Sequence, residues 1–160
     1  MDTHEYRRTL EEFFQGEVTG EALFHCLAES FDDSEHRYQM RVMEQLERET
    51  KELLRANVVR VGGDANESAA ARDRGVAQAK AIAVMPRAKF MHIFQREVRK
   101  FVARFEEVER IGPSEDAQLL AAVTAHEKAL LAFSELETSG AGDPLQPIVA
   151  LLKAVPARPR

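Results

Sequence analysis

Glycine and proline are scarce in this chain, and where they occur they divide it into long segments with helical periodicity. The 160 residues include 8 glycines and 6 prolines. Between these breaks, apolar side chains recur three and four positions apart over runs of about 25 residues, which is the spacing of one helix face. Alternation with a period of two does not persist beyond a few residues, so no strands are expected. The sequence therefore predicts an all-α protein.

Four long helices and a short C-terminal helix are expected. By residue number we predict the long helices at about 3–31, 34–59, 86–110 and 114–138, and the short one within 145–155. Pro86 suits the first turn of the third helix, and Ser114 suits the N-cap of the fourth. Tight turns join the first helix to the second and the third to the fourth. The link between the second and third is long and contains a helical segment of its own, Glu67–Val84.

This pattern of links predicts the topology. Short links make antiparallel neighbours, and a long link can cross a bundle from end to end. We therefore expect an antiparallel four-helix bundle with a long crossover between the second and third helices. Residues 1–155 are expected to form a single domain, and residues 156–160 a disordered tail.

Composition restricts the partners and the compartment. The chain has 22 basic and 27 acidic residues and a formal net charge of −5, which disfavours a nucleic-acid partner. It lacks an apolar run of about 18 residues, so no membrane span is expected. Its N-terminus is charged rather than apolar, and its single cysteine, Cys26, cannot form an internal disulfide. We expect a cytoplasmic protein, and a homodimer because the crossover and C-terminal segments carry spare apolar surface.

Each predicted long helix carries one glutamate on or beside its apolar stripe. These glutamates are Glu17, Glu47, Glu97 and Glu127. Stripe residues on the four helices include Phe13 and Phe24, Met43 and Leu53, Phe94 and Phe101, and Val123 and Leu130. Glu17 and Glu47 are 30 residues apart, as are Glu97 and Glu127, so two matched hairpins would place each pair at one bundle height. Four buried carboxylates repel one another and require protons or cations, and two divalent metals are one source of that charge.

Three helical segments carry a recognisable pattern: GEVTGEALFHCLAE at 16–29, LERETKELL at 46–54 and HEKALLAFSELE at 126–137. These segments resemble helices of the ferritin-like superfamily, in particular its rubrerythrin-type members. Such proteins hold two irons with one Glu from each of two helices and a Glu-x-x-His from each of the other two. The resemblance, which spans the four helices, implies that Glu17 and Glu97 match the single glutamates. It implies that Glu47 and Glu127 match the glutamates of the two Glu-x-x-His pairs.

The sequence departs from this family at both histidines. Thr50 follows Glu47 by three residues and Leu130 follows Glu127 by three, and leucine cannot bind a metal. His126 is adjacent to Glu127 and points about 100° away from it on a straight helix. A standard oxygen-activating di-iron centre is therefore not expected.

Three alternatives remain open. One is an altered iron or manganese site formed by Glu17, Glu47, Glu97 and Glu127, with His126 as a further ligand. The second is a metal-free polar cluster in which Arg104 supplies the counter-charge. The third is a non-catalytic helical dimer that acts as a binding or structural module. The sequence names no reaction or substrate, so it does not decide whether the protein is an enzyme.

Overall fold

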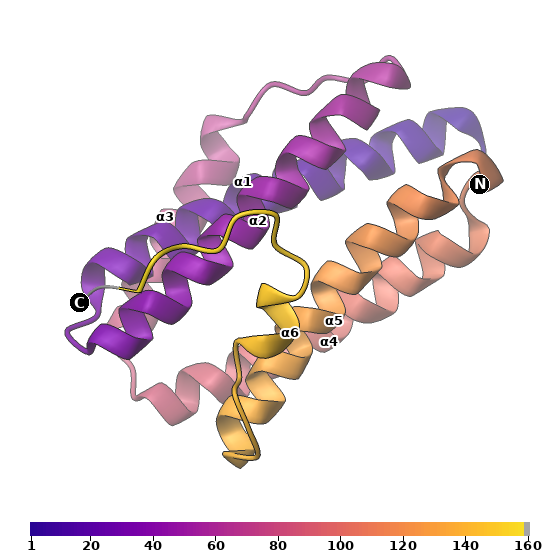
Figure 1. Ribbon diagram of the computed structural model, residues 1–160. Coiled ribbons are helices and arrows are strands. Elements are labelled where there is room, and N and C mark those ends of the chain that lie inside the picture. Colours follow the sequence, from indigo (N-terminus) through magenta and orange to yellow (C-terminus); the bar gives the residue numbers. More distant parts are fainter. Residues whose placement is uncertain (159–160) are drawn as a thin grey trace. The chain divides into compact units, whose positions relative to one another are not determined.

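The computed structural model describes residues 1–158, and the regular secondary structure of these residues is helical, with no strand among them (Figure 1). The helices in chain order are α1 (Thr3–Ser30), α2 (Ser34–Arg60), α3 (Ala69–Ala83), α4 (Arg87–Ile111), the 3₁₀ helix η1 (Ser114–Asp116), α5 (Ala117–Ser139) and α6 (Gln146–Val149). The predicted all-α class is confirmed. Within residues 1–158, no helix combines the length and the apolar character needed to cross a lipid bilayer.

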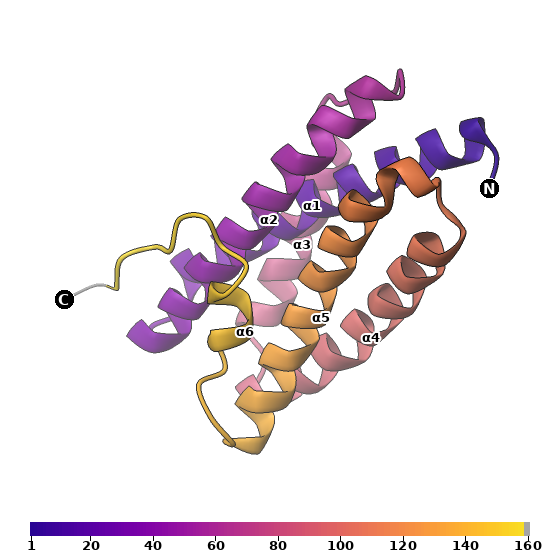
Figure 2. The same cartoon turned by 45° about the vertical axis from the view of Figure 1, so that its right-hand side comes forward.

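The chain divides into two compact units. The first unit contains Asp2–Val84 together with the C-terminal residues from Leu152 onward, and the second contains Met85–Leu151 together with Met1. Each unit is built on a hairpin of two long antiparallel helices, α1 with α2 in the first and α4 with α5 in the second (Figures 1 and 2). The prediction of a single domain over residues 1–155 stays a prediction.

Local capping fixes where the helices of the first unit begin. Asp2 accepts a hydrogen bond from the backbone N–H of Glu5 at 2.8 Å, and Asp33 accepts one from His36 at 2.8 Å. Ser68 caps α3 in the same way through the N–H of Ala71. Each cap satisfies a backbone donor that the first helical turn leaves without a partner.

The core of the first unit lies between α1 and α2. Its fully or almost fully buried side chains include Leu10, Phe14, Phe24, Leu27, Met40, Met43 and Leu54. The helix α3 packs against α1 through small residues. A Cβ atom on Gly75 would lie 2.3 Å from the carbonyl oxygen of Thr19, and the Thr19 hydroxyl donates to the carbonyl of Ala71 at 3.0 Å. Only a residue without a side chain permits this approach of two backbones.

In the second unit, α5 packs along α4, and α6 packs on α5. The helix α5 ends at Ser139 and is capped by Gly140, which has a φ of +65°, a left-handed conformation that glycine adopts without strain. Arg87 at the start of α4 pairs with Glu137 near the end of α5 at 2.8 Å. This pair joins the open end of the hairpin.

The four long helices begin and end within a few residues of their predicted limits, but two details of the prediction are wrong. Pro86 is the N-cap of α4 rather than a residue of its first turn. Ser114 does not cap α5, because it starts the 3₁₀ turn η1, and α5 begins only at Ala117. After the turn at Gly112–Pro113, the chain first forms the 3₁₀ helix η1, which is wound more tightly than an α-helix, and α5 follows it.

Two residues of the expected apolar stripes are also misplaced. Leu53 is 39% exposed, because its neighbour Leu54 occupies the buried face of α2 and successive residues point about 100° apart. Phe101 is 53% exposed. Within the second unit α5 is the helix that packs along α4, so the stripe of α4 is covered only in part.

The C-terminal segment, residues 153–158, lies along α2 in the first unit and is called the strap below. The hydroxyl of Tyr38 donates to the carbonyl of Pro156 at 3.0 Å, and Arg158 pairs with Glu35 at 2.6 Å. Residues 159–160 of the predicted disordered tail lie outside the described residues.

Candidate metal centre

Two of the predicted site residues lie together in the first unit. Glu17 projects from α1 and Glu47 from α2, and both side chains are buried, with 3% and 5% of each residue exposed. A carboxylate oxygen of Glu17 lies within 4.8 Å of one from Glu47. The hairpin brings them together because they lie at equal distances along the chain from the turn at residues 31–33.

A glycine provides the space for this carboxylate pair. Gly20 lies on α1 one turn after Glu17, and a Cβ atom at this position would come within 2.1 Å of Glu47 Oε2. The carboxylate of Glu47 therefore rests against the backbone of α1 at a point where any larger residue would displace it.

Two cations of α2, Lys51 and Arg48, lie within one turn of Glu47 along the helix. Lys51 follows Glu47 by one turn on α2 and is itself buried, with hydrogen bonds to Glu21 and, at 2.8 Å, to Glu67. Burial alone would lower the pKa of Lys51, but its hydrogen bonds to these two carboxylates outweigh burial and raise it. Arg48 adds a second contact to Glu21 at 3.0 Å.

Glu67 links this network to the loop before α3. Hydrogen bonds from Lys51 and Arg72 hold the pKa of Glu67 at about 2, well below its ordinary value of 4.5. Arg55 contributes a further contact at 2.7 Å. Lys51 is thus bound by two carboxylates, those of Glu21 and Glu67.

In the second unit, Glu127 and His126 are both buried on α5, with 7% and 2% exposed. The hydroxyl of Thr124, one turn before Glu127, is also buried and has no hydrogen-bond partner among the described residues. A buried hydroxyl of this kind is rare in a folded protein unless a water, an ion or a ligand supplies the partner. Leu130, three residues after Glu127, is buried too.

Glu97 has a different environment from the other predicted ligands. Its side chain is 38% exposed and pairs with Arg96 at 2.9 Å and with Lys100 at 2.8 Å. Lys100 and then Arg96 lower the pKa of Glu97. These two cations supply the charge that a metal would otherwise provide, and Arg104, the expected counter-charge, is exposed on α4.

Two residues of this region escaped the sequence reasoning. Gly20 carried a usable signal, because a glycine inside a helical segment often marks a close approach of another group. Lys51 carried none, since a lysine beside an apolar stripe usually extends into solvent. Its burial follows from two carboxylates on other segments of the first unit.

Comparison of the chain with protein-family models, with curated proteins and with solved structures gives no match. The ferritin-like resemblance therefore rests on the helical segments quoted above and on the positions of their glutamates. Carboxylate oxygens are ligands for hard divalent cations, and iron and manganese accept them together with imidazole nitrogen.

Proposed function

We propose that this protein binds a divalent metal ion, iron or manganese, through Glu17 and Glu47. The observation that carries the proposal is the approach of these two buried carboxylates to within 4.8 Å of each other. Two negative charges at that separation repel each other strongly where water is excluded. One divalent cation between them would neutralise both, and Gly20 provides the space in which the Glu47 carboxylate lies.

Two carboxylates do not complete the coordination of iron or manganese, which bind four to six ligands. We propose that α1, α2, α4 and α5 form a ferritin-like four-helix bundle, and that Glu127 and His126 supply further ligands. Both are buried on α5, and the buried Thr124 hydroxyl one turn from Glu127 favours a polar occupant there. Glu97 is the weaker candidate because Arg96 and Lys100 already neutralise it.

This ligand set favours binding over oxygen activation. Thr50 and Leu130 replace the two histidines of the family, so fewer nitrogen ligands are available. Affinity for iron should therefore be lower than that of a complete Glu/His site. A role in holding or carrying a metal ion fits these residues better than redox catalysis.

Metal analysis of the purified protein tests the proposal. The protein is expressed in medium supplemented with iron and manganese, and its metal content is measured by mass spectrometry alongside a Glu47→Gln variant. We expect stoichiometric metal in the unaltered protein and a near-complete loss in Glu47→Gln. Glu21→Gln is the matched control, because Glu21 lies on α1 one turn from Glu17 but binds Lys51. It should retain the metal.

A metal-free cluster would give the opposite result. The unaltered protein would then contain only traces of metal, and Glu47→Gln would be as stable as the unaltered protein or more stable, because one repulsive charge is gone. That combination would overturn the metal-binding proposal. His126→Asn separately tests the histidine, since loss of a nitrogen ligand should weaken iron binding more than calcium binding.

A further inference from the structure

An exposed phenylalanine lies near the middle of α4. Of the nine phenylalanines in the chain, only Phe101 is exposed, and 53% of this residue is accessible. Burial of a side chain of this size stabilises a protein by about 1.5–3 kcal/mol. Single apolar side chains are common on protein surfaces, so the groups around Phe101 decide whether it marks an interface.

Opposite charges flank Phe101 on one side of α4. Glu97 precedes Phe101 by four residues and Arg104 follows it by three, and a turn of about 100° per residue places all three side chains on one helix face. The side chain of Glu97 is 38% exposed. Arg104 is exposed and makes no hydrogen bond or ion pair within residues 1–158. It is therefore available to a group outside the chain.

This arrangement of charges is complementary to itself. When two copies of α4 run antiparallel with Phe101 of each at the centre, Glu97 of one copy lies opposite Arg104 of the other, because both residues are almost equally far from Phe101. The same ion pair then forms twice, as a twofold axis requires. In a parallel pair, Glu97 would face Glu97 and Arg104 would face Arg104, and both contacts are repulsive. The charges therefore favour only the antiparallel arrangement.

The rest of the face can take part in such a contact. Oxygens Oε1 and Oε2 of Glu97 accept hydrogen bonds from Arg96 at 2.9 Å and from Lys100 at 2.8 Å. An ionised carboxylate has about four acceptor sites, so Arg104 of a second copy need not displace either cation. The half-buried side chain of Phe94, two turns before Phe101, extends the apolar surface.

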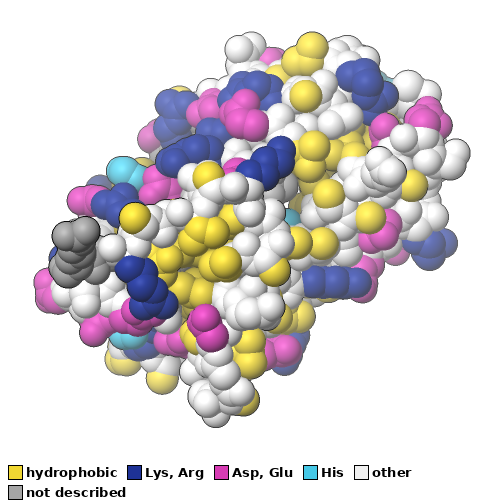
Figure 3. Space-filling model, in the orientation of Figure 1, with side chains coloured by type: hydrophobic (Ala, Val, Ile, Leu, Met, Phe, Trp, Pro, Cys, Tyr) yellow, Lys and Arg dark blue, Asp and Glu magenta, His cyan; other side chains and the backbone are white. Residues whose placement is uncertain are grey.

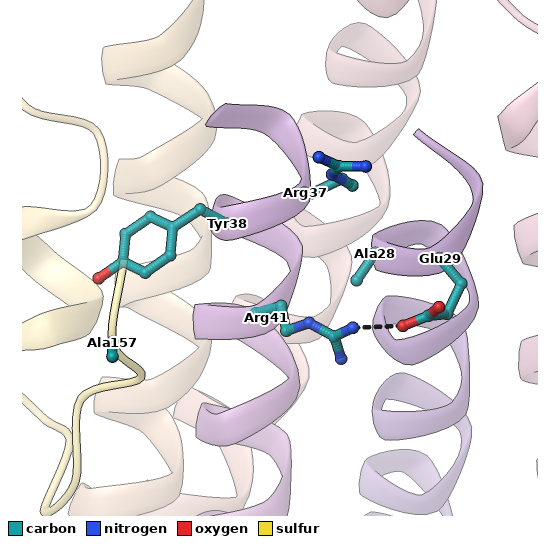
Figure 4. Close-up of a pocket in the computed structure, with 6 residues that line it drawn as sticks. All are labelled: Ala28, Glu29, Arg37, Tyr38, Arg41 and Ala157. Carbon is teal, nitrogen blue, oxygen red and sulfur yellow. Dashed lines mark hydrogen bonds and ion pairs between the residues drawn. The ribbon is translucent and has the colours of Figure 1, made fainter. Parts of the chain in front are cut away.

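The surface beside the strap differs from this face because the chain itself occupies it. Cavities of about 330 and 390 Å³ adjoin the strap. In the first of them, Figure 4 shows Arg41 paired with Glu29, and Tyr38 beside Ala157 of the strap. In the second unit, α5 packs along α4 and leaves Phe101 exposed. The face around Phe101 is thus the one that a second molecule can cover.

We propose that this protein forms a homodimer in which α4 pairs antiparallel with α4 of a second copy, with Phe101 at the centre between two Glu97–Arg104 ion pairs. Phe101 supplies most of the affinity, because aromatic side chains at the centre of an interface dominate binding. The exposed ion pairs add little affinity and set the orientation. This surface differs from the crossover and C-terminal segments, on which the sequence-based expectation of a homodimer rests.

Sedimentation equilibrium of the full chain over a range of concentrations tests this proposal. We expect a reversible equilibrium between monomer and dimer, because one helix from each copy forms only a small interface. Phe101→Ser should raise the dissociation constant more than tenfold, since the central apolar contact is lost. Val59→Ser is the matched control, because Val59 is 62% exposed on α2, and it should dimerise like the unaltered protein. Circular dichroism should show an unchanged helix content in both variants.

Charge reversal tests the alignment of the two helices. Glu97→Arg and Arg104→Glu should each weaken the homodimer about tenfold, because like charges then face each other on both sides of Phe101. An equimolar mixture of these two variants should form a heterodimer as tightly as the unaltered protein forms its homodimer, since opposite charges meet again. Metal content enters none of these readouts, so the result is independent of the proposed metal centre.

Three results would overturn the proposal. The first is a monomer at several hundred micromolar unaltered protein. The second is a dimer that Phe101→Ser leaves unchanged, which would assign dimerisation to another surface. The third is a mixture of Glu97→Arg and Arg104→Glu that associates no more tightly than either variant alone, because these two positions then do not face each other.

Discussion

The carboxylate of Glu47 lies against the backbone of Gly20, so that a Cβ atom added to Gly20 would come within 2.1 Å of Glu47 Oε2. This relationship joins the two helices of the first unit at the point where Glu17 and Glu47 meet. It also makes Gly20 a positioning residue for the proposed metal centre, since the glycine itself provides no ligand. A small substitution there can therefore separate folding from metal binding.

Gly20→Ala should abolish metal binding while the protein remains folded. The added methyl group displaces the Glu47 carboxylate, which is the end of a flexible side chain and can move without shifting the helices. Titration with manganese, followed by metal analysis, should show the loss, and circular dichroism should show an unchanged helix content. Gly16→Ala is the matched control, because no atom lies within 4 Å of its added Cβ. It should retain metal binding and stabilise the helix by about 0.5–1 kcal/mol.

Gly75→Ala should destabilise the first unit. Its Cβ would lie 2.3 Å from the carbonyl oxygen of Thr19 and 2.9 Å from the backbone nitrogen of Leu23, and these backbone atoms cannot move aside as a flexible side chain can. The helix α3 must then shift away from α1. We expect a loss of about 1–3 kcal/mol in the free energy of unfolding, measured by urea denaturation. A variant as stable as the unaltered protein would contradict the close packing of α3 on α1.

Acid should weaken the first unit through Glu67. The pKa of this carboxyl is about 2 in the folded state and 4.5 ordinarily, because Lys51 and Arg72 stabilise its charged form. A depressed pKa favours the folded state above pH 4.5, and the effect is lost as the pH falls from 4.5 towards 2. Urea denaturation between pH 7 and pH 3 should therefore show a falling stability that is shallower in Glu67→Gln. Glu12→Gln, at an exposed position of α1, should follow the unaltered protein.

Acid should also release the strap through Glu49. Burial alone would raise the pKa of Glu49, but hydrogen bonds from the backbone of Lys153, from Gln45 and from the backbone of Ala154 outweigh it and lower the pKa below 4.5. The strap contact is therefore present above that value and is lost as the pH falls through the lowered pKa. NMR should show the amide signals of Lys153 and Ala154 moving together in that range.

Glu49→Gln should produce the same change at neutral pH. The two strap N–H groups bind different oxygens of Glu49, and an amide side chain retains only one acceptor oxygen. If the amide signals of Lys153 and Ala154 change neither with pH nor in Glu49→Gln, the role of Glu49 is contradicted. Basic and acidic side chains lie side by side on the surface (Figure 3), so the net charge of the protein does not report a local contact such as that of Glu49.

The helices follow from local information in the sequence. Apolar periodicity, sparse glycine and proline, and the short turn at residues 31–33 determine α1 and α2 and place Glu17 and Glu47 at equal distances from that turn. These signals act between residues a few positions apart. The meeting of Glu17 and Glu47 could therefore be predicted from the sequence by helix geometry alone.

Other features depend on which groups the folded chain brings within reach of a long side chain. Glu97 lies beside the apolar stripe of α4, and it pairs with Arg96 and Lys100. This pairing was not predicted, because several cations lie within reach of the flexible Glu97 side chain. Lys51 is buried only because Glu21 and Glu67 arrive from other segments, and Glu49 gains its partners from residues more than 100 positions away. Sequence periodicity determines which way a backbone position faces, whereas only the tertiary structure determines which charges meet there.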